Sequence, residues 1–217
     1  MSVKIPAAGV ELEADIATPE AAPGVVLFVH GSGSSRRSSR NRYVAGELQQ
    51  AGLATVLVDL LTPEEEQVDM RTGQLRFDID LLSARVMALT DWLVEHPPTA
   101  GLGVGLFGAS TGAAAALVAA AARPVTVEAV VSRGGRPDLA GEFLRLVRQP
   151  TLLIVGGRDV DVIELNRNAM RLLAAETRLE IVPGATHLFE EPGALEQVAQ
   201  LARDWFLPHM KRGPHNG

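Results

Sequence analysis

The sequence predicts an α/β fold, with a mostly parallel central sheet, helices on both faces and no large cap domain. Short apolar runs alternate with longer helix-like segments along the whole chain, as in folds built from strand–helix–strand units. Val25–Val29 and Leu53–Val58 are almost continuously apolar, which is typical of strands buried on both sides. Hydrophobic residues make up 47% of the 217 residues, enough to bury the core of one domain.

The first elements are predicted in order from these patterns. Val3–Ile5 and Val10–Ala17 are separated by a short segment that contains glycine, so we expect an antiparallel hairpin at the sheet edge. The next elements are the strand Val25–Val29, the helix Asn41–Gln50, the strand Leu53–Val58, a polar loop over Leu61–Phe77 and a helix over Asp78–Glu95 before Pro97-Pro98. The short segment around Thr62–Gln67 within this loop is the only candidate lid.

The second half continues the alternation and completes one domain. Its elements are an apolar strand from Gly101, the helix Thr111–Ala122, the strand Val125–Val131, a short helix near Asp138–Val147, a strand from Thr151, the helix Ile163–Ala175, a strand from Leu179 and the helix Gly193–Trp205. We expect a single domain over residues 1–207 and a polar tail over residues 208–217.

A serine stands between two glycines where the strand from Gly101 gives way to the next helix. The segment Gly108-Ala-Ser-Thr-Gly112 has the strand–turn–helix context of a nucleophile elbow, in which glycines permit a sharp bend that exposes the serine hydroxyl. The helix start adds free N–H groups and a positive dipole end beside that hydroxyl. Ser110 is therefore the candidate nucleophile, although small residues also gather in ordinary turns.

Two candidate partners follow later strands. Asp159 comes after the strand from Thr151 and two glycines, and His187 comes after the strand from Leu179. Because the carboxyl ends of parallel strands meet at one edge of the sheet, we expect Ser110, Asp159 and His187 to come together. A serine hydroxyl needs a base to act as a nucleophile, and an imidazole oriented by a carboxylate supplies one. The chain order of the three residues is typical of hydrolases with such an elbow.

Alternatives stay open for the two partners. Asp161 competes with Asp159 for the acidic role, and Asp159 is also placed to cap the following helix. His187 is also consistent with an ordinary loop histidine.

Five stretches carry a resemblance to a known family. They are His30–Ser35, Phe107–Gly112, Ser132–Asp138, Gly156–Asp159 and Gly184–Gly193. On these stretches the chain resembles the dienelactone-hydrolase-like branch of the α/β-hydrolases, including forms fused to phosphoribosyltransferase domains, from about Val25 to Phe206. The resemblance implies that Ser110 is the nucleophile, Asp159 the orienting acid and His187 the base.

The chain departs from that family in one respect. The dienelactone hydrolases that give the branch its name use a cysteine nucleophile, and this sequence has no cysteine. Their particular substrate is therefore not expected here. The 217 residues also contain no phosphoribosyltransferase part.

The elbow and the loop after the first central strand predict an oxyanion hole. One donor is expected to be the main-chain N–H of Thr111, which follows the serine. The second is expected from the glycine-rich loop, with Ser32 preferred and Gly33 the alternative, because glycines let the main chain approach a substrate closely. His30 is expected to pack beneath this loop and to have a structural role.

Arginines follow two of the strands that build this edge of the sheet. Arg37 lies after the oxyanion loop, and Arg133 and Arg136 follow the strand Val125–Val131. Their forked guanidinium groups suit a substrate carboxylate or phosphate. Loop arginines in a glutamate-rich chain more often form exposed ion pairs, so a substrate-binding role for these three is a hypothesis.

Composition argues against several partners. The net charge of −6 argues against nucleic acid. No apolar run reaches the length of a membrane span and the first residues contain no signal-peptide core, so we expect a cytoplasmic protein without membrane contacts. No spacing of histidines and carboxylates predicts a metal site, and no cofactor is expected.

These features predict a serine hydrolase that cleaves a small ester, thioester or lactone through an acyl-enzyme intermediate, as a carboxylesterase or dienelactone-hydrolase-like enzyme does. The arginines add the hypothesis that this substrate is anionic. Short substrates are expected because no large cap is visible. Acyl transfer to an acceptor other than water shares the first half of this reaction and stays open. A ligand-binding module without catalysis is the alternative from another class, and covalent labelling by a fluorophosphonate separates it from an enzyme.

Overall fold

The structure is a computed structural model that describes residues 1–210. Its strands are β1 (Ser2–Ala7), β2 (Val10–Ala17), β3 (Gly24–Val29), β4 (Ala54–Val58), β5 (Gly103–Ala109), β6 (Val127–Arg133), β7 (Thr151–Gly156) and β8 (Thr177–Val182). Its helices are α1 (Ser39–Gln50), α2 (Pro63–Thr72), α3 (Ile79–Glu95), α4 (Thr111–Ala122), α5 (Val160–Met170) and α6 (Ala194–His209), with the 3₁₀ segments η1 (Leu75–Phe77) and η2 (Pro137–Leu146).

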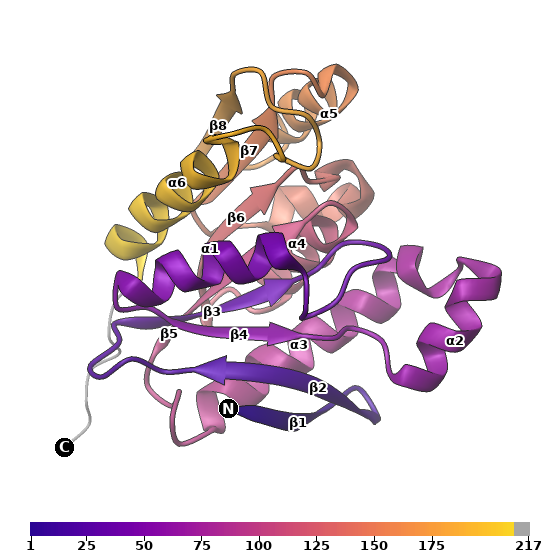
Figure 1. Cartoon of the computed structure of the whole chain (residues 1–217), viewed down its shortest axis with the longest axis vertical. Helices are drawn as coiled ribbons and strands as arrows, with labels where there is room; N and C mark the ends of the chain where they lie inside the picture. Colours follow the sequence, from indigo (N-terminus) through magenta and orange to yellow (C-terminus); the bar gives the residue numbers. More distant parts are fainter. Residues whose placement is uncertain (211–217) are drawn as a thin grey trace.

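The strands form one eight-stranded sheet in the order β1-β2-β4-β3-β5-β6-β7-β8 (Figure 1). Strands β3 to β8 run parallel to one another, whereas β1 and β2 form an antiparallel hairpin that joins the sheet along β4. The predicted fold class and the predicted edge hairpin are therefore confirmed.

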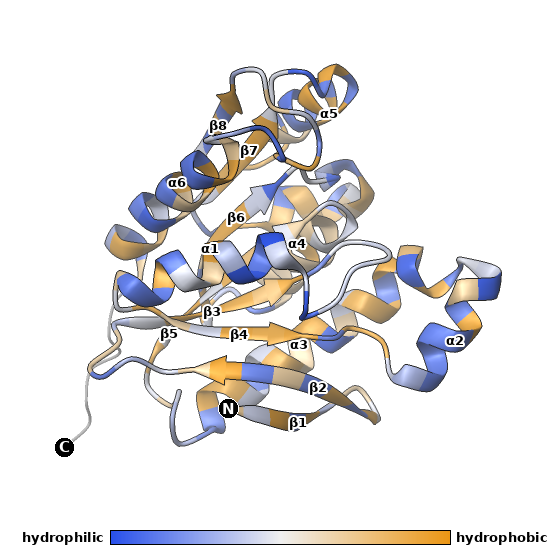
Figure 2. Ribbon diagram, in the orientation of Figure 1, coloured by the Kyte–Doolittle hydropathy of each residue, from blue (hydrophilic) through white to orange (hydrophobic). Residues whose placement is uncertain are grey.

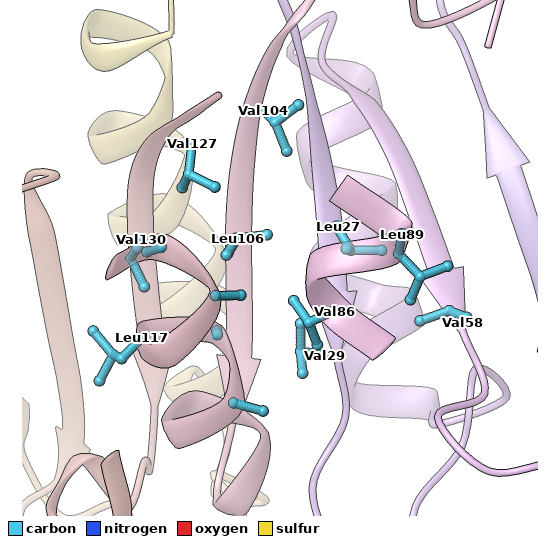
Figure 3. Packing of buried hydrophobic residues seen from close by; sticks show 14 of the residues in the cluster. Leu27, Val29, Val58, Val86, Leu89, Val104, Leu106, Leu117, Val127 and Val130 are labelled. Carbon is cyan, nitrogen blue, oxygen red and sulfur yellow. The ribbon is translucent and has the colours of Figure 1, made fainter. Parts of the chain in front are cut away.

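Helices bury both faces of the sheet, which is why its central strands are apolar at successive positions. Along β3, Val26 and Phe28 pack into the cluster beneath α1 and α6, while Leu27 and Val29 pack into the cluster beneath α3 and α4. Figure 3 shows the second cluster, in which valines and leucines of the strands meet those of α3 and α4. The central strands β3, β4 and β7 are accordingly mostly hydrophobic in Figure 2, whereas β2 alternates and α1, α2 and α6 carry hydrophilic residues.

The polar loop predicted over Leu61–Phe77 is wrong, because α2 and η1 occupy most of it. Thr62 begins α2 with a capping box: its hydroxyl accepts the Glu65 N–H at 3.2 Å, and the Glu65 carboxylate accepts the Thr62 N–H at 2.8 Å. Pro63 occupies the first helical position, and Gly73 ends the helix at φ 65°. These signals stand in the sequence, and α2 projects beyond the ends of β3 and β4 (Figure 1).

Other differences concern boundaries. The helix predicted over Ile163–Ala175 begins and ends earlier, as Val160–Met170, and the predicted helix near Asp138–Val147 is of 3₁₀ type. The last helix continues past Trp205 to His209, and residues 211–217 of the predicted tail lie outside the described residues. Within residues 1–210, no helix has the length and apolar character that crossing a membrane requires.

Candidate active site

Ser110 lies at a strained bend between β5 and α4. Its backbone angles are φ 50° and ψ −122°, a combination that residues with a side chain rarely adopt. The flanking glycines make room for the bend: a side chain at Gly108 would overlap the main chain of Ala113, and one at Gly112 would overlap the carbonyl oxygen of His30. The G-x-S-x-G pattern thus has a steric cause at both glycines.

Hydrogen bonds tie this elbow to the end of β6. The Ser110 N–H donates to the Arg133 carbonyl oxygen at 3.2 Å. The Ser110 carbonyl oxygen accepts the N–H groups of Ala113 at 3.1 Å and of Arg136 at 3.0 Å. Because both main-chain polar groups of Ser110 have partners, the strained geometry is held from two sides.

His187 and Asp159 are in direct contact. His187 Nδ1 lies 2.6 Å from Asp159 Oδ2, with 40% of the imidazole side chain and 16% of the aspartate side chain exposed. Asp159 stands at the N-cap position of α5, yet its side chain makes no capping hydrogen bond. Asp161 is exposed in the first turn of α5. Of the two carboxylates that the sequence left open, Asp159 is the one that contacts the imidazole.

The imidazole approaches the same strand end as the elbow. A Cβ at Gly134 would lie 3.5 Å from His187 Cε1, and the preceding residue, Arg133, accepts the Ser110 N–H. Among the hydrogen bonds of residues 1–210, that of His187 to Asp159 is present and none joins His187 to the Ser110 hydroxyl. Catalytic hydrogen bonds are often long or misaligned until a substrate binds.

The loop after β3 packs directly on the elbow. A Cβ at Gly31 would lie 2.9 Å from Ser110 Cβ and 2.9 Å from the Ala109 carbonyl oxygen, so only glycine fits there. The Ser32 N–H, expected from the sequence to be an oxyanion donor, donates to Thr111 Oγ1 at 3.0 Å. No sequence pattern indicates this second role for Thr111.

His30 fixes the orientation of that loop. Its Nε2 lies 2.9 Å from the Leu60 N–H, which is a donor, so Nε2 accepts and Nδ1 carries the proton. Nδ1 then donates to the Gly31 carbonyl oxygen at 2.9 Å. Burial lowers the pKa of His30, which favours this neutral form. The imidazole therefore joins the loop after β3 to the segment that follows β4.

The three arginines singled out from the sequence have different surroundings. Arg136 donates two hydrogen bonds to the Asp138 carboxylate, at 2.7 and 2.9 Å, and this pairing raises the pKa of its guanidinium. Arg37 is exposed at the rim of a pocket. Arg133 is only 8% exposed.

Arg133 is a buried cation that feels the charge of a second arginine. Within the described part of the chain its Nε and Nη1 have no hydrogen-bond partner, while Nη2 donates to Asn41 Oδ1 at 3.4 Å and the Phe189 ring lies 5.9 Å from the guanidinium carbon. Burial and the nearby charge of Arg40 lower the pKa of Arg133 to about 10. Arg40 Nε is unpartnered in the same sense, and its Nη1 lies 3.2 Å from exposed Glu190.

A pocket of about 480 Å³ adjoins the elbow. The loop after β3 forms one wall of the pocket, and α2 with η1 forms another. The sequence predicts a loop where α2 and η1 lie. Its lining includes Ser32, Ser34, Arg37, Arg40, Met70 and Arg76. Gly31 also lines the pocket and packs on Ser110, which brings the pocket up to the elbow.

Comparison with known proteins shows the family and the fold. The model of the dienelactone hydrolase family matches residues 12–207. The chain belongs to the dienelactone hydrolase family. The crystal structure of a dienelactone hydrolase from Anabaena variabilis ATCC 29413 is 59% identical in sequence, with a TM-score of 0.96 over 97% of this chain and 98% of that one. Est1E from Butyrivibrio proteoclasticus has a TM-score of 0.79 over 96% and 98% of the two chains at 16% identity, and thus shares the α/β-hydrolase fold.

A longer relative has a different name. A protein of Mycobacterium tuberculosis strain H37Rv, named as a phosphoribosyl transferase, is 59% identical over 208 residues, which cover 96% of this chain and 46% of that protein. The chain thus spans about half the length of this relative. Membership of the dienelactone hydrolase family and the α/β-hydrolase fold together support a hydrolase function for this chain.

Proposed function

We propose that this member of the dienelactone hydrolase family is a serine hydrolase that cleaves a small ester, thioester or lactone through an acyl-enzyme intermediate. The observation that carries the proposal is the 2.6 Å contact between His187 and Asp159 at the strand end to which the strained Ser110 elbow is bonded. A carboxylate on one imidazole nitrogen leaves the other nitrogen free to act as a base.

In this mechanism Ser110 Oγ attacks the substrate carbonyl carbon as His187 Nε2 takes the hydroxyl proton. The carbonyl π electrons move to oxygen, and the resulting oxyanion is stabilised by the Thr111 N–H and by a donor from the loop at Ser32. The intermediate collapses as the leaving alcohol, thiol or lactone oxygen takes the proton from His187. Water then attacks the acyl group with His187 as base, which restores Ser110.

Two arginines that are only partly hydrogen-bonded support an anionic substrate. Arg133 and Arg40 influence each other electrostatically, and both have buried N–H groups without a partner among residues 1–210, which a carboxylate or phosphate that reached them would satisfy. Arg37 at the pocket rim adds a third positive charge. Arg136 is already paired with Asp138, so it has no part in this proposal.

We assign the transferase name of the longer mycobacterial relative to the part of that protein beyond this chain. The matched 46% corresponds to the chain that the dienelactone hydrolase model describes. A phosphoribosyl acceptor or donor site is not required by any step above.

The test is acylation of Ser110. Wild-type protein should hydrolyse p-nitrophenyl acetate and take up a fluorophosphonate probe, and Ser110→Ala should lose both. Asp159→Asn should lower kcat by about 10³- to 10⁴-fold, because the imidazole then loses the partner that orients it. Asp161→Asn is the matched control, two residues away on the same helix start, and should stay within about twofold of wild type. Full esterase activity in Ser110→Ala would refute the proposal.

A further inference from the structure

Thr111 presents a second polar group at the proposed oxyanion hole. Its side chain is 4% exposed, and Oγ1 accepts the Ser32 N–H at 3.0 Å. Thr111 is also the first residue of α4, so its own N–H has no acceptor within the helix. One residue therefore places an N–H and an O–H beside the Ser110 elbow.

The hydroxyl proton of Thr111 is free to be donated. A hydroxyl can accept two hydrogen bonds and donate one. Within residues 1–210, Oγ1 accepts the Ser32 N–H, and no acceptor for its proton is present. The accepted bond polarises the O–H group, which makes it a better donor to a third group.

The Ser32 N–H is kept on the hydroxyl by rigid neighbours. The Gly31 carbonyl oxygen and the Ser32 N–H belong to the same peptide group, and His30 Nδ1 holds that carbonyl at 2.9 Å. Gly31 itself packs on Ser110 without room for a side chain. With its carbonyl end bonded to His30, the peptide has little freedom to turn its N–H from Thr111 toward a substrate.

We infer that Thr111 is a further catalytic residue, whose hydroxyl donates a hydrogen bond to the substrate oxyanion while it accepts one from the Ser32 N–H. The inference rests on the proposed serine hydrolase function and changes the part taken by Ser32, which acts through the hydroxyl. The Thr111 proton stays on its oxygen throughout: the Ser110 proton goes to His187, and the new negative charge resides on the former carbonyl oxygen.

The experiment compares three variants with wild type. Thr111→Val keeps the shape and removes the hydroxyl, Thr111→Ser keeps the hydroxyl, and Thr111→Ala serves if the valine variant does not fold. Pre-steady-state acylation by p-nitrophenyl acetate and the rate of fluorophosphonate labelling are measured, with thermal unfolding as the check on structure. Loss of the hydroxyl should slow acylation about 10- to 100-fold with little change in KM, and Thr111→Ser should stay within about threefold of wild type.

A thionoester separates catalysis from structure. Its carbonyl oxygen is replaced by sulfur, a weak hydrogen-bond acceptor, so the ratio of wild-type to Thr111→Val acylation rates should be clearly smaller than for the matched ester. Equal losses on both substrates, or wild-type acylation by Thr111→Val, would overturn the inference and leave the serine hydrolase intact. Wild-type protein that is never acylated at Ser110 would overturn both.

Discussion

At the scale of single residues, the close approach of the loop after β3 to Ser110 depends on the absence of a side chain at Gly31. The two nearest obstacles, Ser110 Cβ and the Ala109 carbonyl oxygen, are each 2.9 Å from the position that a Cβ would take. One obstacle is main chain and the other is fixed by the strained elbow, so neither yields easily. Any side chain must displace the loop.

Gly31→Ala is therefore expected to lower kcat by about tenfold or more, because displacement of the loop moves the Ser32 N–H that bonds to Thr111 at the proposed oxyanion hole. Gly46→Ala is the matched control: Gly46 lies inside α1 with nothing within 4 Å of its Cβ position. That change should raise the free energy of unfolding by about 0.5–1 kcal/mol and leave kcat unchanged. Steady-state esterase kinetics and urea unfolding measure both effects, and an undiminished kcat in Gly31→Ala would contradict a role for the loop.

The positions of the candidate site residues were predictable where a residue directly follows a parallel strand. Asp159 and His187 follow parallel strands, and the structure brings them into contact. The choice between Asp159 and Asp161 required geometry, because both stand at the start of α5. The bond from Ser32 to Thr111 was not predictable, since it depends on how closely α4 approaches the loop after β3.

At the scale of elements, His30 couples the loops that follow β3 and β4, and it does so only in its neutral form. Protonation of Nε2 would turn the acceptor of the Leu60 N–H into a second donor. Acidification is therefore expected to weaken the connection that His30 makes between these two loops.

The folded pKa of His30 lies below its ordinary value of about 6.5, so the unfolded chain binds the proton first as pH falls. The stabilising contribution is complete above pH 6.5 and is lost as pH falls toward the folded pKa. His30→Asn keeps a donor for Gly31 and does not titrate. The excess unfolding free energy of wild type over this variant should shrink as pH falls from 7.5 to 5.5. A pH-independent difference in paired urea titrations would refute the coupling.

The helix α2 shows what hydrophobic patterns miss. Its first turn is acidic and few of its residues are buried, so periodicity does not reveal it. Arg85 of α3, 1% exposed, anchors it through two hydrogen bonds to Glu65, at 2.5 and 2.7 Å, and one to the Leu60 carbonyl oxygen at 2.6 Å. The capping box was visible in the sequence, whereas the anchor depends on tertiary packing.

At the scale of the whole molecule, the sheet topology places three distant parts of the chain at one edge of the sheet. They are Arg133 at the end of β6, Arg40 in α1 and the loop after β8 that carries His187. The alternation of apolar runs was sufficient to predict this sheet, because both of its faces are covered. The surroundings of Arg133 were not predictable, because Asn41 and Phe189 reach it from α1 and from the loop after β8. In a chain with a net charge of −6, any preference for anions must come from such a local cluster.

Arg133→Met is expected to lower the ratio of kcat/KM for p-nitrophenyl hydrogen succinate to that for neutral p-nitrophenyl butyrate by about tenfold or more. It should also raise the free energy of unfolding by about 1 kcal/mol, because it removes a buried charge that has no carboxylate partner. Arg136→Met is the control, since its guanidinium is occupied by Asp138. An unchanged ratio in Arg133→Met would exclude Arg133 from anion binding.

The bend at Ser110 implies a trade-off between heat resistance and turnover. Glycine adopts φ 50° and ψ −122° without steric penalty, so Ser110→Gly should unfold at a higher temperature, with a net gain of about 1 kcal/mol. Ser110→Ala keeps the penalty and should gain nothing, which separates relief of strain from loss of the hydroxyl in a melting experiment. Both variants are expected to lack esterase activity, so selection for thermal stability alone would remove the proposed nucleophile.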